Sequence, residues 1–293
     1  MNFDVTMGYV HLAQRQFTRY LKATLRFPVE MQGKKYLKHL LDNSIYSLSI
    51  DVSVGWTRFD VRIIPELKDK FIRIKELAEI WLGEVELRRT NEFPINLMST
   101  PDLLEHPDIL ELALHDEFLT PVSIYLGQVP RLTQLAIFWS PKNKTINSSQ
   151  KFHYDHRDTR QIKIFLNLND VNEDNGPLCF LPADVSSLFI SKIGYNQLKN
   201  DDDVVYSACS RSTLIKNVGE AGTGVMVDTS RCLHYGSRQN KEDRLVFMAS
   251  FVRPNCVNPK KKSRVLDSVR RKFANELYKD DPIRQYALTV RAV

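Results

Sequence analysis

The sequence is poor in the residues that mark several classes of protein. Its 13 prolines and 11 glycines among 293 residues are too few for a fibrous or disordered chain. No apolar run approaches the roughly 18 residues that a membrane span requires, so we expect no membrane span. The first residues include Asp4, His11 and Arg15, and they lack the apolar stretch of a secretory signal. We therefore expect a globular protein of the cytoplasm.

Cysteine is also scarce, and its spacing disfavours the usual cysteine-based sites. Cys179, Cys209, Cys232 and Cys256 are widely separated, without a Cys-x-x-Cys pair. This spacing is not that of a dense disulfide framework. We expect four reduced thiols in the protein core.

The chain carries little excess charge outside its C-terminal part. The formal net charge is +6, and residues 254–293 account for it with 10 Lys and Arg residues against 4 acids. Residues 1–253 are balanced, with 31 charges of each sign. The charge therefore gives no basic binding face, and nucleic-acid binding is not expected. We interpret the basic run at 259–272 as the outer face of a packed helix; the alternative is docking to an acidic partner or anionic cofactor.

Hydrophobic spacing changes along the chain, without an internal repeat or a low-complexity linker. The first part has helical spacing at 12–25, 71–87 and 109–125, and strand-like alternation at 45–64. The later part has short apolar runs separated by turns, which is typical of an antiparallel sandwich or barrel. These runs are 133–139, 151–155, 161–169, 178–181, 212–217, 224–227 and 244–253.

We expect all 293 residues to form one domain with three parts. A mostly helical part at 1–126 would cover the sheet, and a β core would follow at 127–253. A basic helical segment would occupy 254–293. The long connection at 183–211 is expected to form a lid over the mouth of the core.

The densest polar segment, residues 152–158, contains two His-x-Asp pairs. Residues two apart on a strand point the same way, so His153 and Asp155 share one face and His156 and Asp158 share the other. Only one pair can face a core. Such a pair with a later histidine forms the two-histidine, one-carboxylate set that suits Fe(II) and leaves three positions open for substrates. Taken alone, a His-x-Asp pair is also common as a structural contact.

The third ligand must come from another part of the chain. The histidines at 11, 39, 106 and 115 lie in the helical part, whereas His234 follows the apolar run at 224–227. His234 is therefore the natural candidate. Arg244 begins the last run ten residues later, and its guanidinium could pair with a carboxylate of a bound co-substrate.

These motifs together resemble the phytanoyl-CoA dioxygenase family of Fe(II)/2-oxoglutarate oxygenases. The resemblance covers roughly residues 116–252. It lies in His-Tyr-Asp at 153–155, in 163–171 followed by Glu-Asp-Asn-Gly-Pro-Leu at 173–178, and in Leu-His-Tyr-Gly at 233–236 followed by Arg244. The chain has Leu-Pro-Ala-Asp-Val at 181–185, where the family commonly has Pro-Gly-Ser-His. Asp155 stands where related halogenases have Gly or Ala, which favours hydroxylation over halogenation.

The resemblance implies a fold that is mostly β with helical elaboration. Its core would be a double-stranded β-helix, or cupin-like jelly roll, flanked by N-terminal and C-terminal helices. It also implies Fe(II) held by the metal-binding and catalytic residues His153, Asp155 and His234. The co-substrate 2-oxoglutarate would chelate the metal and place its far carboxylate on Arg244.

The activity that the resemblance implies is oxidation of a small molecule by O2, with release of succinate and CO2. We expect hydroxylation of a biosynthetic intermediate or a lipid-like acid. The alternatives are desaturation, ring formation or epimerisation by the same oxidant. Two further alternatives are a non-catalytic jelly-roll binding protein and an adaptor whose basic tail recruits a nucleic acid or an acidic protein. The motifs define neither the substrate nor the oligomeric state.

Two faces are expected on the run at 161–169. The aliphatic face would be covered by the N-terminal helices; it consists of Ile162, Ile164, Leu166 and Leu168. The mixed face would look into the metal cavity, with Lys163 and Phe165 at the co-substrate and Asn167 at the substrate. The alternative leaves Lys163 on a solvated exterior. Trp139 is expected in the core, with substrate binding as its alternative role.

Overall fold

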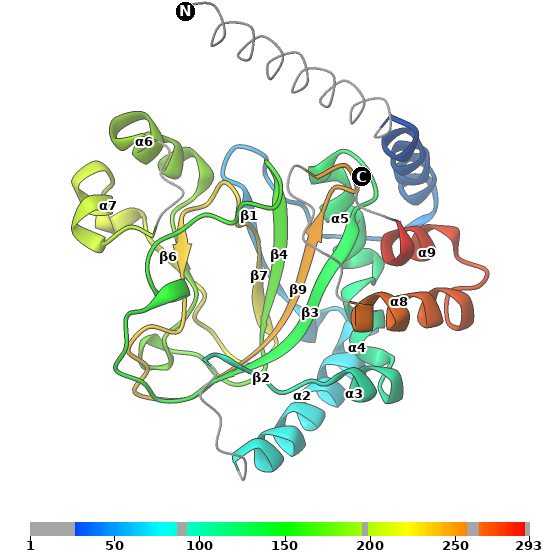
Figure 1. The fold of residues 1–293 in the computed structure, drawn as a ribbon, viewed down its shortest axis with the longest axis horizontal. Coiled ribbons are helices and arrows are strands. Elements are labelled where there is room, and N and C mark those ends of the chain that lie inside the picture. Colours follow the sequence, from blue (N-terminus) through cyan, green and yellow to red (C-terminus); the bar gives the residue numbers. More distant parts are fainter. Residues whose placement is uncertain (1–26, 87–92, 195–198, 257–263, 291–293) are drawn as a thin grey trace, which may run out of the picture.

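The computed structural model describes residues 27–86, 93–194, 199–256 and 264–290. Antiparallel sheets lie at its centre, with helices on either side (Figure 1). The expected helix at 12–25 lies outside the described residues. Residues 259–263 of the basic run at 259–272 also lie outside them. None of the described helices is long and apolar enough to cross a membrane.

The larger sheet has six strands within the described residues, in the order β1-β7-β4-β9-β3-β2. The strands are β1 (Trp56–Asp60), β2 (Ile95–Asn96), β3 (Arg131–Ser140), β4 (Gln161–Asn167), β7 (Thr223–Asp228) and β9 (Arg244–Val252). Every residue of β9 is buried, and β3 and β4 pair with it on its two edges. The strand β1 lies within the strand-like alternation expected at 45–64, which confirms that expectation. The short strand β2 also comes from the mostly helical part of the chain.

A smaller sheet of three strands in the described part of the chain faces the larger one. Its strands are β6 (Ile215–Lys216), β5 (Cys179–Phe180) and β8 (His234–Tyr235). The strand expected at 151–155 is not formed as a ladder, because its residues pair with different partners. Phe152 bridges to Asn200, and His153 bridges to His234.

One face of the larger sheet lies under a layer of helices. This layer contains residues 27–43, α2 (Pro65–Glu86), α3 (Thr100–Glu105), α4 (Asp108–Ala113), α5 (Asp116–Leu126), α8 (Arg264–Glu276) and α9 (Pro282–Thr289). Pro65 is the first residue of α2, where its missing N–H has no cost. The helix expected at 109–125 is divided into α4 and α5, because the His115 side chain caps a new helix through the Glu117 N–H.

The main hydrophobic core lies between these helices and the larger sheet. It contains the aliphatic residues of β4 together with Leu168, as the alternation predicts. Ile162, Ile164 and Leu166 are completely buried. Removal of this apolar surface from water is the main favourable contribution to folding. The prediction that helices cover this face is confirmed.

The connection at 183–211 packs against the smaller sheet. It contains α6 (Ala183–Ile193) and α7 (Asp202–Ala208), which lie on the far side of β6 in Figure 1. Phe189 and Val205 form a buried cluster with Phe152, Tyr154 and Leu233. None of the described residues of this connection lines the cavity described below, and the lid stays a prediction.

The fold is thus a mixture of helices and antiparallel sheets, as expected. All four cysteines are reduced and buried, which confirms the interpretation of their spacing. The jelly-roll path of the chain stays a prediction. The two sheets and the small apolar cluster between them, which includes Leu178, Phe180 and Val225, position the candidate site.

Candidate metal centre

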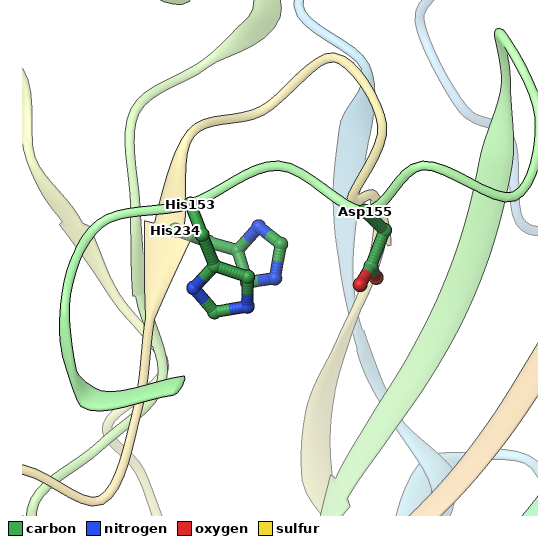
Figure 2. A group of neighbouring side chains, drawn as sticks. All are labelled: His153, Asp155 and His234. Carbon is green, nitrogen blue, oxygen red and sulfur yellow. The ribbon is translucent and has the colours of Figure 1, made fainter. Parts of the chain in front are cut away.

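Three predicted ligands converge on one point between the sheets. The side chains of His153, Asp155 and His234 each offer a ligand atom, and these atoms lie within 4.8 Å of one another. Figure 2 shows the two imidazoles side by side and the carboxylate of Asp155 pointing towards them. Asp155, which precedes β4, and His234, which begins β8, are 79 residues apart in the chain. This geometry fits a single metal ion.

The backbone fixes the spacing of the two histidines. The His153 N–H donates to the His234 carbonyl at 3.0 Å, and the His234 N–H donates to the His153 carbonyl at 3.1 Å. The ring centroids are 4.3 Å apart. Each ring is also oriented by a carbonyl two residues earlier in the chain: Nδ1 lies 2.8 Å from the Lys151 oxygen in His153 and 2.9 Å from the Cys232 oxygen in His234.

These contacts determine which ring nitrogen is available to a metal. A carbonyl oxygen only accepts, so each Nδ1 carries the proton and each neutral Nε2 retains a lone pair. Burial lowers the pKa of His153 below its ordinary value. Burial also lowers the pKa of His234 to about 3, helped by the adjacent His153. Both rings are therefore neutral at physiological pH, which is the form that binds a metal.

The carboxylate of Asp155 is held ionised by a neighbouring cation. Burial acts to raise the pKa of Asp155, but the charge of Lys163, the neighbouring His234 and the hydrogen bonds to the carboxylate together hold the pKa well below its ordinary value. The Lys163 Nζ lies 2.7 Å from Asp155 Oδ2, and the Gln161 amide donates to the same oxygen at 3.4 Å. The Asp155 N–H donates to the Thr229 carbonyl at 2.8 Å, which anchors the loop.

A cavity of about 250 Å³ opens beside the two histidines. Its walls include Lys163 and Phe165 of β4, as the alternation of that strand predicts. The alternative of a solvated Lys163 is wrong, because this side chain is only 16% exposed and faces Asp155. Apolar side chains of β3 and β9 form much of the remaining wall: Phe138, Val246 and Met248.

Arg244 lies in the same cavity and is 8% exposed. Its Nη2 donates to the Ser237 hydroxyl, whereas its buried Nε has no hydrogen-bond partner among the described residues. No described carboxylate forms an ion pair with it. Burial lowers the pKa of Arg244 to about 10, so the guanidinium is still charged at neutral pH. A buried cation in this state favours binding of an anion.

Ser237 was not predicted from the sequence. Its hydroxyl contacts both Arg244 and the Ser140 hydroxyl, the latter at 2.8 Å. It lies in the segment after β8 with φ of 56°. A serine in a turn carries no distinctive sequence signal, and only the fold brings it to Arg244.

Asn167 was predicted to contact substrate and lies elsewhere, whereas Trp139 packs against the core as expected. Asn167 is completely buried and accepts from the Asn217 amide at 3.2 Å, so it belongs to a structural polar contact beyond the cavity wall. Trp139 lies on the other face of β3, where it packs against the main core and donates to Asp243 at 3.0 Å. Its neighbour Phe138 faces the cavity instead. The alternation of side chains along β3 could have identified Phe138 from the sequence.

The second His-x-Asp pair is used differently. Asp158 accepts two hydrogen bonds from the Arg253 guanidinium, one of them 2.8 Å long, and it is 5% exposed. This buried ion pair ties the loop after Asp155 to the end of β9. Of the two pairs, His153 and Asp155 therefore form the candidate metal centre.

No family model and no curated protein sequence matches the chain. Several solved structures are similar to it at low sequence identity. The non-heme α-ketoglutarate-dependent epimerase SnoN from nogalamycin biosynthesis has a TM-score of 0.46 and 15% identity, over 73% of this chain and 84% of SnoN. EctD from S. alaskensis has a TM-score of 0.49 and 12% identity, over 72% of this chain and 79% of EctD. HygX from Streptomyces hygroscopicus, with nickel and 2-oxoglutarate bound, has a TM-score of 0.47 and 15% identity, over 69% of this chain and 83% of HygX.

Proposed function

We propose that the protein is an Fe(II)- and 2-oxoglutarate-dependent dioxygenase that hydroxylates a small molecule. The observation that supports this most strongly is the pairing of a metal triad with a buried, carboxylate-free guanidinium in one cavity. His153 and His234 line that cavity together with Arg244. A metal and a cation in one pocket match a co-substrate that chelates with one end and carries a carboxylate at the other.

The residues fit both groups. Two neutral imidazoles and one ionised carboxylate, converging within 4.8 Å, are the donor set that suits Fe(II) and leaves positions open. Arg244 would hold the far carboxylate of 2-oxoglutarate through its planar fork, with Ser237 fixing the guanidinium. The unpaired Nε of Arg244 would then gain a partner.

Bound Fe(II), 2-oxoglutarate and O2 would supply oxidation of a substrate C–H bond, with release of succinate and CO2. The chain's own residues position and shield this chemistry. His153, Asp155 and His234 hold the metal, and Arg244 orients the co-substrate. Lys163 and Phe165 lie beside it. The apolar wall of Phe138, Val246 and Met248 excludes water from the reacting centre.

The type of oxidation depends on which substrate atom lies nearest the metal. Desaturation, cyclisation and epimerisation would use the same residues, and they remain alternatives to hydroxylation. The substrate is proposed to be small, because the cavity of about 250 Å³ must also accept the co-substrate. No feature of the described site requires a macromolecular substrate.

The proposal is tested by adding Fe(II) and 2-oxoglutarate to the protein without oxygen. The visible metal-to-ligand charge-transfer band should form with the wild type and should be absent in His153→Ala, His234→Ala and Asp155→Ala. His156→Ala is the matched control, because it removes the histidine of the other pair, and it should retain the band. Metal content should fall in the same three variants.

The opposite result is equally clear. If the wild type gives no band, or if His153→Ala and His234→Ala retain it, the dioxygenase proposal is wrong. Binding of a small molecule without a metal would then favour the alternative of a non-catalytic binding protein.

A further inference from the structure

A polar side chain that holds neither the metal nor the co-substrate lines the cavity at the end away from Arg244. Gln134 of β3 lies in the cavity wall together with both metal-binding histidines. On β3, Ser140 pairs directly with Arg244 of β9, whereas Gln134 pairs with Ser250. Gln134 is therefore six residues along β3 from the Arg244 pair, which is roughly 20 Å of extended strand.

The metal ligand Asp155 is held at the end that carries Gln134. Lys163 of β4 pairs with Ser250 from the other edge of β9. Residues paired directly across a sheet lie on the same face, so Gln134, Ser250 and Lys163 form one row across the cavity face. The Lys163 Nζ lies 2.7 Å from Asp155 Oδ2. Gln134 thus belongs to the row of the sheet that contacts the metal centre.

A β-bulge turns Gln134 towards the cavity. The pairing of β3 with β9 shifts between Leu132 and Gln134, so Thr133 and Gln134 together stand opposite Ser250. A shift of one residue exchanges the two faces of a strand. If the pairing before the bulge continued unchanged, Gln134 would therefore lie on the helix-covered face. The extra residue instead presents its carboxamide to the cavity.

The Gln134 carboxamide is free within the described part of the chain. The adjacent Ser250 hydroxyl accepts from the Gln161 amide at 3.1 Å and from the Thr133 hydroxyl at 3.4 Å, so it is already satisfied by other residues. No hydrogen bond to a described residue engages Gln134, which is exposed at the cavity mouth. A carboxamide both donates and accepts, so it can bind an uncharged polar group of either kind.

The charged side chains of the cavity wall have other partners. Among the described residues that line it, these are Lys163 and Arg244. Lys163 is paired with Asp155, and Arg244 would hold the co-substrate. The described wall contains no carboxylate for a cationic substrate and no further cation for an anionic one. A charged substrate would lose its hydration without gaining a partner, whereas an uncharged one avoids this loss.

The wall between Gln134 and the Arg244 end is apolar. In the next row, Met248 of β9 pairs with Phe165 of β4, and both line the cavity. Phe138 of β3 follows on the same face. These side chains suit an apolar body, which would be removed from water on binding. One hydrogen-bonding group at the mouth and an apolar surface behind it define the recognition chemistry.

We propose that the substrate is an uncharged small molecule with an apolar body and an amide or hydroxyl group, and that the Gln134 carboxamide binds this group. The inference rests on the proposed function and names its substrate class. It excludes the lipid-like acid that was one of the expected substrates. Gln134 is thus a specificity residue rather than a ligand of the metal or of the co-substrate.

The test uses the full-length protein loaded with Mn(II) and N-oxalylglycine, an unreactive analogue of 2-oxoglutarate. Four probes of equal chain length are titrated: hexanamide, 1-hexanol, hexanoate and hexylammonium. Proton NMR follows them, because Mn(II) broadens the signals of a molecule bound beside it. At least one uncharged probe should bind about 10-fold more tightly than hexanoate and hexylammonium. The two uncharged probes distinguish an amide from a hydroxyl group.

Substitution then assigns the preference to one side chain. Gln134→Leu should weaken binding of the preferred uncharged probe by about 5- to 10-fold and leave N-oxalylglycine affinity unchanged. Gln134→Glu should bind hexylammonium more tightly than either uncharged probe, because the new carboxylate pairs with the cation. Gln32→Leu is the matched control, since Gln32 lies in the helical residues 27–43 and does not line the cavity. It should bind all four probes as the wild type does.

The outcomes separate this inference from the proposed function. Failure of the wild type to bind Mn(II) and N-oxalylglycine would overturn both, because the substrate site rests on the loaded metal centre. With normal loading, the inference alone is wrong if a charged probe binds as tightly as the uncharged ones, or if Gln134→Leu binds the uncharged probes as the wild type does. A loss of N-oxalylglycine affinity in Gln134→Leu would also overturn it, because Gln134 would then bind the co-substrate.

Discussion

The two faces of β4 and β9 differ sharply although they belong to the same strands. Ile162, Ile164 and Leu166 of β4 are completely buried under the helices. Lys163 and Phe165 alternate with them and line the cavity. Because successive side chains of a strand point to opposite faces, one stretch of sequence serves two purposes. The helix-covered face stabilises the fold, and the cavity face carries charges that a core would exclude.

The cavity face contributes less to the stability of the fold than the helix-covered face does, because it buries charged groups. It holds the buried guanidinium of Arg244 and the ion pair between Lys163 and Asp155. Removing a charged group from water costs roughly several kcal/mol in a protein, and the attraction between opposite charges offsets only part of this cost. The comparison therefore predicts that substitutions on the cavity face change ligand binding, whereas those on the helix-covered face change stability.

The largest effect is expected at Arg244. Arg244→Met should weaken binding of 2-oxoglutarate by about 100- to 1000-fold, because a buried charge pair with the co-substrate is lost. The free energy of unfolding should not fall, since an unpaired buried cation is replaced by an apolar side chain. Titration of the charge-transfer band and urea unfolding measure the two quantities. Unchanged co-substrate affinity would remove Arg244 from the site.

A change on the other face should give the opposite result. Leu166→Ala should lower the free energy of unfolding by about 3 kcal/mol, because it opens a cavity in the main core. The affinity for 2-oxoglutarate should stay within about twofold of the wild type. Urea unfolding and the same titration test this. A large loss of co-substrate affinity with little loss of stability would contradict the separation of the two faces.

The buried His234 predicts a dependence of stability on pH. Its pKa is lowered from 6.5 to about 3 in the folded protein. Between these values the unfolded chain binds a proton that the folded chain does not, so stability falls as the pH falls through this window. From pH 7 to pH 5 the metal-free wild type should lose about 2 kcal/mol more than His234→Asn. Equal losses in the two proteins, measured by urea unfolding, would show that His234 is not held neutral by burial.

The smallest effect is expected at Lys163. Its ammonium lies 2.7 Å from an oxygen of Asp155 and competes with a metal for that carboxylate. Lys163→Met should therefore bind Mn(II) about 10-fold more tightly when no co-substrate is present. The exposed Lys142 provides a control, and Lys142→Met should bind Mn(II) as the wild type does. Weaker binding by Lys163→Met would mean that this lysine supports the metal site rather than opposing it.

The sequence predicts much of this fold because hydrophobic alternation is local. The runs at 161–169 and 244–253 correspond to β4 and β9, and on β4 only Asn167 departs from the expected faces, because it does not line the cavity. The two-residue strands β2 and β8 were missed, because so few residues carry no periodic signal. The packing of the connection at 183–211 against the smaller sheet was not predicted, because sequence alone does not define which side of a sheet a connection crosses.

The sequence predicted the part of the candidate site that depends on residue chemistry and spacing. His153, Asp155 and His234 were recognised by ligand type, and the fold brings them together. Trp139 was assigned an alternative role at the substrate, but it occupies the wrong face of β3. Ser237 could not be found from a pattern, because its position depends on how separate segments meet. Long-range contacts of this kind exist only in the folded chain.

The reciprocal hydrogen bonds between the main chains of His153 and His234 have a kinetic consequence. They hold the two imidazoles at their separation through the main chain, so these two ligands need no large rearrangement when an ion arrives. Capture of a metal should thus be a simple bimolecular event whose rate rises linearly with ion concentration and reaches no plateau. The protein would then exchange its metal without partial unfolding.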